Sequence, residues 1–134
     1  MFEYDVVYIK GNPNSGTLVQ HEQIDAAVMD LIKDYSYKII ESHEKNIKNL
    51  DHIPKSKIYI GFSRGSRYLN KLNKTTLKIS IGGITGSGIH QFVHENDYIL
   101  KGDISKESMN AHFLIAQEDK NKIHVLIRQF LEKH

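Results

Sequence analysis

The segment Gly61-Phe-Ser-Arg-Gly65 has residue types and spacing that suit covalent chemistry. It follows a short apolar run at residues 57–60 and precedes residues 66–72, which can be helical. A serine at a sharp strand-to-helix turn has its hydroxyl pushed out of the sheet, and the flanking glycines let strand and helix approach closely. The pattern therefore predicts that Ser63 is a nucleophile. The alternative is a glycine-rich turn that only packs well.

A serine hydroxyl becomes a good nucleophile when a base, usually histidine, is oriented by a carboxylate. Downstream of Ser63, Asp97 lies just beyond a predicted strand that ends at Val93, and His112 precedes a short apolar run and the last predicted helix. We therefore expect His112 to be the base and Asp97 to orient it. Asp103 is the rival acid. Asp97 could instead be a turn residue, and His112 a structural histidine.

Short apolar runs alternate with helical patterns along the chain. Strands are predicted at residues 4–9, 37–40, 57–60, 77–81 and 89–93. Helices are predicted at residues 21–35, at 66–72 and from Glu118 or Asp119 onward, with one or two polar helical turns at 44–50. The apolar stripes of the first and last helices are Ile24, Ala27, Val28, Leu31 and Ile32, and Ile123, Leu126, Ile127, Phe130 and Leu131. This alternation predicts an α/β fold with a mostly parallel sheet, whose carboxyl-end loops gather the functional groups.

The composition is that of an ordinary globular domain. The chain has 134 residues, of which 40% are hydrophobic and 25% charged, and a single domain spanning residues 1–134 is expected. No apolar segment is long enough for a membrane span, and no signal peptide is recognised, so a cytoplasmic protein without a membrane partner is expected. The absence of cysteine excludes disulfides and thiolate chemistry. The basic stretch at 64–74 has the pattern of an exposed helix, so no nucleic-acid partner is predicted.

Two further patterns resemble cofactor-binding motifs, but each lacks a residue that the motif requires. The loop at residues 11–17 resembles a phosphate-binding loop, but Thr17 occupies the position where that motif needs lysine. His-Glu pairs begin at His21, His43 and His94, but none continues to His-Glu-x-x-His. We therefore expect neither a metal nor another cofactor.

The chain resembles a small, lid-less member of the α/β-hydrolase superfamily over nearly its whole length. Residues 6–12 resemble the family's oxyanion strand and loop, and 61–65 resemble its nucleophile elbow. Residues 93–99 resemble the strand end that carries the acid, and 111–114 resemble the histidine segment. The resemblance implies a three-layer α/β/α fold with a mostly parallel sheet: a reduced α/β-hydrolase core without a cap domain.

By this resemblance Ser63, His112 and Asp97 form a catalytic triad, and the backbone N–H groups of Arg64 and Asn12 form the oxyanion hole. The implied function is a serine hydrolase that cleaves a small ester, thioester or related acyl substrate. Two departures are Lys10, where the family usually has histidine, and the absence of glycine before the acid. The alternative function is a non-catalytic binding protein that keeps the fold. A truncated sheet also leaves exposed edges, which makes a homodimer an expectation.

Overall fold

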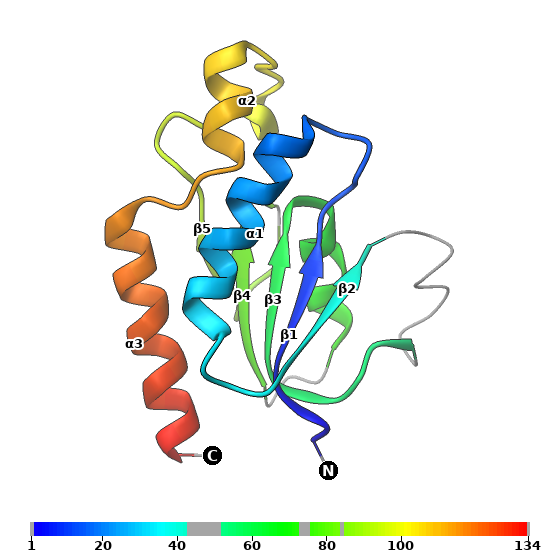
Figure 1. The fold of residues 1–134 in the computed structure, drawn as a ribbon, viewed down its shortest axis with the longest axis vertical. Helices are drawn as coiled ribbons and strands as arrows, with labels where there is room; N and C mark the ends of the chain where they lie inside the picture. The colour runs from blue at the N-terminus through cyan, green and yellow to red at the C-terminus, as the bar shows by residue number, and fades with distance from the viewer. Residues whose placement is uncertain (1, 43–51, 73–75, 84, 134) are drawn as a thin grey trace.

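The computed structural model describes residues 2–42, 52–72, 76–83 and 85–133 (Figure 1). The elements are β1 (Tyr4–Lys10), α1 (Leu18–Ile32), β2 (Tyr37–Glu41), β3 (Ser56–Phe62), η2 (Ser63–Lys71), β4 (Leu77–Ile81), β5 (His90–Phe92), η3 (Ile99–Lys101), α2 (Lys106–His112) and α3 (Gln117–Lys133). The polar helical turns expected at residues 44–50 lie outside the described residues.

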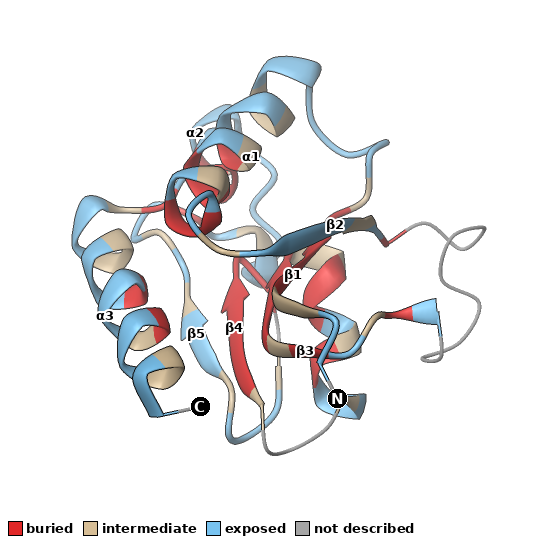
Figure 2. Ribbon diagram, turned by 60° about the horizontal axis from the view of Figure 1, so that its bottom comes forward, coloured by how far each residue is buried: buried red, intermediate tan, exposed pale blue. Residues whose placement is uncertain are grey.

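The five strands form one sheet in the order β2-β1-β3-β4-β5, and every neighbouring pair is parallel. The predicted α/β class is confirmed, and the sheet is parallel throughout. The strand arrows all point to the end of the molecule where α2 lies (Figure 1). The central strands β1, β3 and β4 are mostly buried, whereas the edge strands β2 and β5 are mostly exposed (Figure 2).

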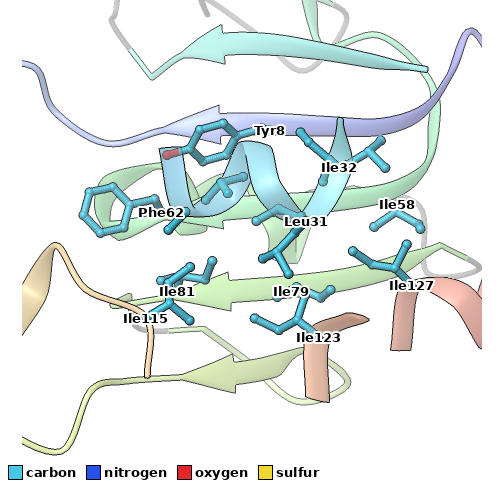
Figure 3. Packing of buried hydrophobic residues seen from close by; sticks show 14 of the residues in the cluster. Tyr8, Leu31, Ile32, Ile58, Phe62, Ile79, Ile81, Ile115, Ile123 and Ile127 are labelled. Atoms are coloured by element: carbon cyan, nitrogen blue, oxygen red, sulfur yellow. The ribbon is translucent and has the colours of Figure 1, made fainter. Parts of the chain in front are cut away.

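Both faces of the sheet carry an apolar cluster. On one face Tyr8 of β1 packs in a cluster with residues of α1 and α3, including Leu31 and Ile123 (Figure 3). On the other face Val7 and Ile9 pack with Leu69 of η2 and with Tyr59. Because alternate residues of a strand point to opposite faces, a strand covered on both sides is apolar almost throughout. This explains the near-continuous apolar runs of β1 and β3.

The buried residues of α1 are the five that its spacing predicted. The helix begins at Leu18, however, three residues before the predicted start. Thr17 caps it: the Thr17 side chain accepts the backbone N–H of Gln20, and Gln20 Oε1 accepts the backbone N–H of Thr17. This reciprocal capping box stabilises a first turn whose apolar residues, Leu18 and Val19, are exposed, so the spacing of the buried residues does not reveal it. In α3, Ile123 and Ile127 are buried, and Leu126, Phe130 and Leu131 are partly buried against the same cluster.

Two other elements differ from the sequence-based expectation. The helical segment after β3 is a 3₁₀ helix that begins at Ser63, before the predicted residue 66. The helix α2 was not predicted, because residues 106–112 are mostly polar and lack an apolar stripe. Its N-cap is Ser105, whose side chain accepts the backbone N–H of Ser108. This short helix carries His112 at its last position.

A buried tyrosine ties β1 to α1. The Tyr8 hydroxyl donates to Asp25 Oδ1 at 3.0 Å, and Asp25 Oδ2 lies 2.9 Å from Lys10 Nζ. Burial, followed by the nearby Asp25 charge and their hydrogen bond, raises the pKa of Tyr8 well above its ordinary value. The Tyr8 hydroxyl therefore stays protonated and available as a donor within the core.

We expect Asp25→Ala to lower the free energy of unfolding by about 1–3 kcal/mol, because it leaves the buried Tyr8 hydroxyl without its acceptor. In a Tyr8→Phe background the same substitution should cost less, since no hydroxyl remains to be paired. Urea unfolding of the four proteins in this double-mutant cycle measures the difference. Equal costs in the two backgrounds would contradict a role for the Tyr8–Asp25 hydrogen bond.

Candidate active site

Ser63 has an unusual backbone conformation at the end of β3. Its φ is +52°, and no other non-glycine residue in the described part of the chain has a positive φ. Residues with a Cβ avoid this left-handed region because the Cβ crowds the following carbonyl oxygen. Strain of this kind persists where the surrounding packing holds it. The local backbone at Ser63 is therefore that of a sharp strand-to-helix turn.

The two glycines of the motif allow this turn to pack. A Cβ at Gly61 would lie 2.8 Å from Ser66 Cα, and a Cβ at Gly65 would lie 2.1 Å from the carbonyl oxygen of Ile9. Both distances are shorter than real Cβ contacts, so the start of η2 can lie against β3 and β1 only where these side chains are absent. The glycine spacing is therefore a packing requirement of this turn.

Two buried serines stabilise the turn through hydrogen bonds. Ser66 Oγ donates to the carbonyl oxygen of Gly61 at 3.0 Å, and Ser80 Oγ of β4 donates to Ser66 Oγ at 2.8 Å. Both serines are fully buried. Neither serine belongs to the residues predicted from the sequence to form the site. The available signal was a small polar residue, Ser80, between two isoleucines of β4.

The structure brings the three predicted side chains together. Ser63 Oγ lies 3.0 Å from His112 Nε2, and His112 Nδ1 lies 2.9 Å from Asp97 Oδ2. The first distance falls within the range of roughly 2.6–3.2 Å over which histidine can accept a serine proton. His112 and Asp97 are both buried, with exposed fractions of 6% and 8%. In the sequence, Ser63 lies 49 positions from His112, and Asp97 lies 15 positions from it.

The Asp97 carboxylate is held on both sides. Its Oδ2 faces the His112 ring, while Oδ1 accepts the backbone N–H of Ile99 at 3.0 Å. The next residue, Tyr98, donates its backbone N–H to Ser108 Oγ at 2.8 Å, which joins this loop to α2. The helix that carries the histidine is thus tied directly to the loop that carries the acid.

Asp103, the rival acid, lies outside the hydrogen-bonded group of Ser63, His112 and Asp97. It is exposed, and its Oδ1 accepts the backbone N–H of Ser105 at 2.9 Å. This hydrogen bond lowers the pKa of the Asp103 carboxyl group. Asp103 therefore supports the turn before α2, whereas Asp97 contacts the histidine.

Aromatic rings and a glycine fix the position of the histidine ring. The ring centroids of Phe62 and Phe113 lie 5.2 and 5.3 Å from that of His112. On another side, a Cβ at Gly82 would lie 3.1 Å from His112 Cε1. Gly82 also has a φ of +64°, which favours glycine at this position. This packing limits rotation of His112 away from Ser63.

A cavity of about 310 Å³ opens beside Ser63. Its lining residues come from the carboxyl-end loops of several strands and are Asn12, Ser15, Ser63, Arg64, Arg67, Gly82, Gly83, Ile99, Leu100 and His112. Both residues that the resemblance assigned to the oxyanion hole, Asn12 and Arg64, are among them. They follow β1 and β3, the adjacent strands at which the strand order reverses, and ligands of open α/β sheets bind in such crevices.

The loop that carries Asn12 is a tight turn. Asn12 Oδ1 accepts the backbone N–H of Asn14 at 3.0 Å, and its carbonyl oxygen accepts the N–H of Ser15 at 3.2 Å. At Gly11 a Cβ would lie 3.1 Å from the Phe62 ring, so the loop passes close to the end of β3. These contacts hold Asn12 at the edge of the cavity near Ser63.

His21, His94 and His124 lie outside this group, and His43 lies outside the described residues. His21 Nε2 contacts the carbonyl oxygen of Ser15, and His124 is exposed on α3. Within the described residues, no cluster of three or more potential metal ligands occurs, and no helix has the length and apolar character to cross a membrane.

No family model, curated protein or solved structure matches this chain. Function is therefore inferred from the geometry of the site.

The strain at Ser63 can be measured separately from its chemistry. Ser63→Gly should unfold with a free energy about 1 kcal/mol higher than Ser63→Ala, because glycine adopts a φ of +52° at little cost whereas alanine keeps the strain. Chemical denaturation of both variants provides the comparison. An alanine variant that is the more stable of the two would contradict a strained turn at this residue.

Proposed function

We propose that this protein is a serine hydrolase that cleaves a small ester, thioester or related acyl compound through an acyl-enzyme. The observation that carries the proposal is the continuous hydrogen-bonded series from Ser63 through His112 to Asp97, which begins at a strained turn beside a cavity. A solvated surface serine would need none of these features. A buried carboxylate and histidine aligned on one hydroxyl are the requirements for activating a serine.

In the proposed reaction Asp97 accepts a hydrogen bond from His112 Nδ1–H, which leaves Nε2 as the acceptor of the Ser63 proton. Ser63 Oγ attacks the substrate carbonyl carbon while its proton passes to His112 Nε2. The imidazolium that results is stabilised by the Asp97 carboxylate, which remains ionised. His112 then gives this proton to the departing alcohol or thiol, and the acyl group remains on Ser63.

The carbonyl oxygen becomes negatively charged during this attack. We assign its stabilisation to the backbone N–H groups of Arg64 and Asn12, which belong to two residues that line the cavity with Ser63. Arg64 lies in the first turn of η2, where helical N–H groups point out of the N-terminus. In the second half of the reaction His112 removes a proton from water, the water oxygen attacks the acyl carbon, and Ser63 is restored.

The overall arrangement supports the same proposal. Ser63, Asp97 and His112 occur in the chain order found in α/β-hydrolases, with the nucleophile directly after a parallel strand. Helices α1 and α3 pack on one face of the sheet and η2 packs on the other. We propose on this basis that the fold is a reduced three-layer α/β-hydrolase core without a cap domain. A cavity of about 310 Å³ suits a small acyl substrate.

A fluorophosphonate probe tests for an activated serine. We expect the wild-type protein to be labelled at Ser63 and expect labelling to be lost in Ser63→Ala and His112→Ala, because the first lacks the nucleophile and the second lacks the base. His124→Ala is the matched control, since His124 is exposed on α3. Circular dichroism establishes that each variant is folded. A folded wild-type protein that is not labelled would contradict the hydrolase and would favour a non-catalytic binding protein.

A pair of aspartate variants tests which acid orients His112. Asp97→Asn should lower kcat for a small activated ester by about 1000-fold or more, because asparagine does not stabilise the imidazolium and can favour the wrong tautomer. Asp103→Asn should keep nearly full activity, since the Asp103 side chain contacts Ser105 and is exposed. Steady-state hydrolysis of 4-nitrophenyl acetate provides kcat. A larger loss in Asp103→Asn would overturn the assignment of Asp97.

A further inference from the structure

The charged residues that line the cavity beside Ser63 are of one sign. Arg64 and Arg67 both line it, and none of its described lining residues is aspartate or glutamate. The Asp97 carboxylate, which is not among the described lining residues, is buried and contacts His112 Nδ1 and the N–H of Ile99. The charged side chains among the described lining residues, those of Arg64 and Arg67, are therefore cations.

The backbone adds to this positive field. Ser63 is the first residue of η2, a 3₁₀ helix of nine residues whose N-terminus lies at the cavity. The N-terminus of a helix carries a partial positive charge. Arg67, one turn further along η2, is exposed and can meet a ligand from solvent. Guanidinium groups bind carboxylate and phosphate oxygens through paired N–H donors.

The remaining lining residues include both apolar and polar side chains. Ile99 and Leu100 of η3 are apolar, whereas Asn12 and Ser15 of the β1–α1 loop are polar. The neighbouring cavities have a different charge pattern. One between β5 and α3 is lined by both Glu118 and Lys122, and one at the end of β1 is lined by both Lys10 and Glu41. The site cavity is thus lined by apolar residues as well as by two arginines.

We infer that the substrate of this site carries an anionic group, a carboxylate or a phosphate, which binds Arg67 and Arg64 while the scissile carbonyl lies at Ser63. This inference rests on the proposed hydrolase function and specifies its substrate class. The apolar part of the substrate packs against Ile99 and Leu100. The arginines position the substrate, and the reaction at the carbonyl remains that of Ser63 and His112.

Matched esters that differ in charge test the inference. The first set varies the leaving group: 4-acetoxybenzoate, 4-acetoxyphenyl phosphate and the neutral methyl 4-acetoxybenzoate. The second set varies the acyl group: monomethyl glutarate and the neutral methyl pentanoate. We expect at least one anionic ester to have a kcat/KM about tenfold or more above that of its neutral counterpart, since hydrogen bonds to charged groups contribute that much. The preferred ester distinguishes a carboxylate from a phosphate.

Substitutions test whether the arginines cause the preference. The ratio of kcat/KM for the preferred anionic ester to that for its neutral counterpart should fall about tenfold in Arg67→Gln and invert in Arg67→Glu. Arg67→Lys should keep part of the ratio, because it keeps the charge but loses the paired donors. Lys71→Gln is the matched control: Lys71 is an exposed cation of the same helix that does not line the cavity, and its removal should leave the ratio unchanged.

The outcomes separate this inference from the proposed function. Fluorophosphonate labelling of Ser63 together with equal kcat/KM for charged and neutral esters would overturn the anionic substrate and leave the hydrolase standing. If the protein is not labelled, calorimetric titration with glutarate and with inorganic phosphate tests the anion site independently of hydrolase activity. Binding of either anion that weakens about tenfold in Arg67→Gln, but not in Lys71→Gln, would support an anion site. Absence of binding would overturn it.

Discussion

The close approach of β3, β1 and the start of η2 is the constraint on which the site depends. Gly61 and Gly65 have no room for a Cβ, and the turn between them places Ser63 at a positive φ. The buried Ser66–Ser80 hydrogen bond fastens this turn to β4. The strain at Ser63 is therefore held by packing and hydrogen bonds that involve three strands, and the hydroxyl is directed out of the sheet toward the cavity.

The other side of the site is assembled by short segments rather than by the sheet. The loop after β5 supplies Asp97, and α2 supplies His112 at its last position. Tyr98 and Ser108 join these two segments through a backbone-to-side-chain hydrogen bond. The sheet thus fixes Ser63, and the β5–α2 connection fixes His112 and Asp97. If the proposed reaction is correct, displacement of α2 alone would separate the base from Ser63.

Much of the fold could be predicted from the sequence because both faces of the sheet are buried, which makes strands such as β1 continuous apolar runs. The α2 helix could not, since its stability comes from the Ser105 cap and from contacts with the β5 loop rather than from an apolar stripe. The placement of Ser63 and Asp97 after strands predicted that they would lie at one edge of the sheet, whereas His112 reaches that edge from the end of α2. The sequence favoured Asp97 but left Asp103 open as the rival, because both aspartates occupy sequence that suits turns, and in the structure Asp97 contacts His112 whereas Asp103 contacts Ser105.

The most direct measurement is mass spectrometry of the protein mixed with 4-nitrophenyl acetate and quenched in acid before deacylation is complete. The account predicts one acetyl group on the peptide that contains Ser63, and predicts that this adduct is absent from Ser63→Ala. It would be contradicted by a folded protein that releases 4-nitrophenol at the same rate in both forms. It would also be contradicted by acetyl groups spread over lysines with none on Ser63.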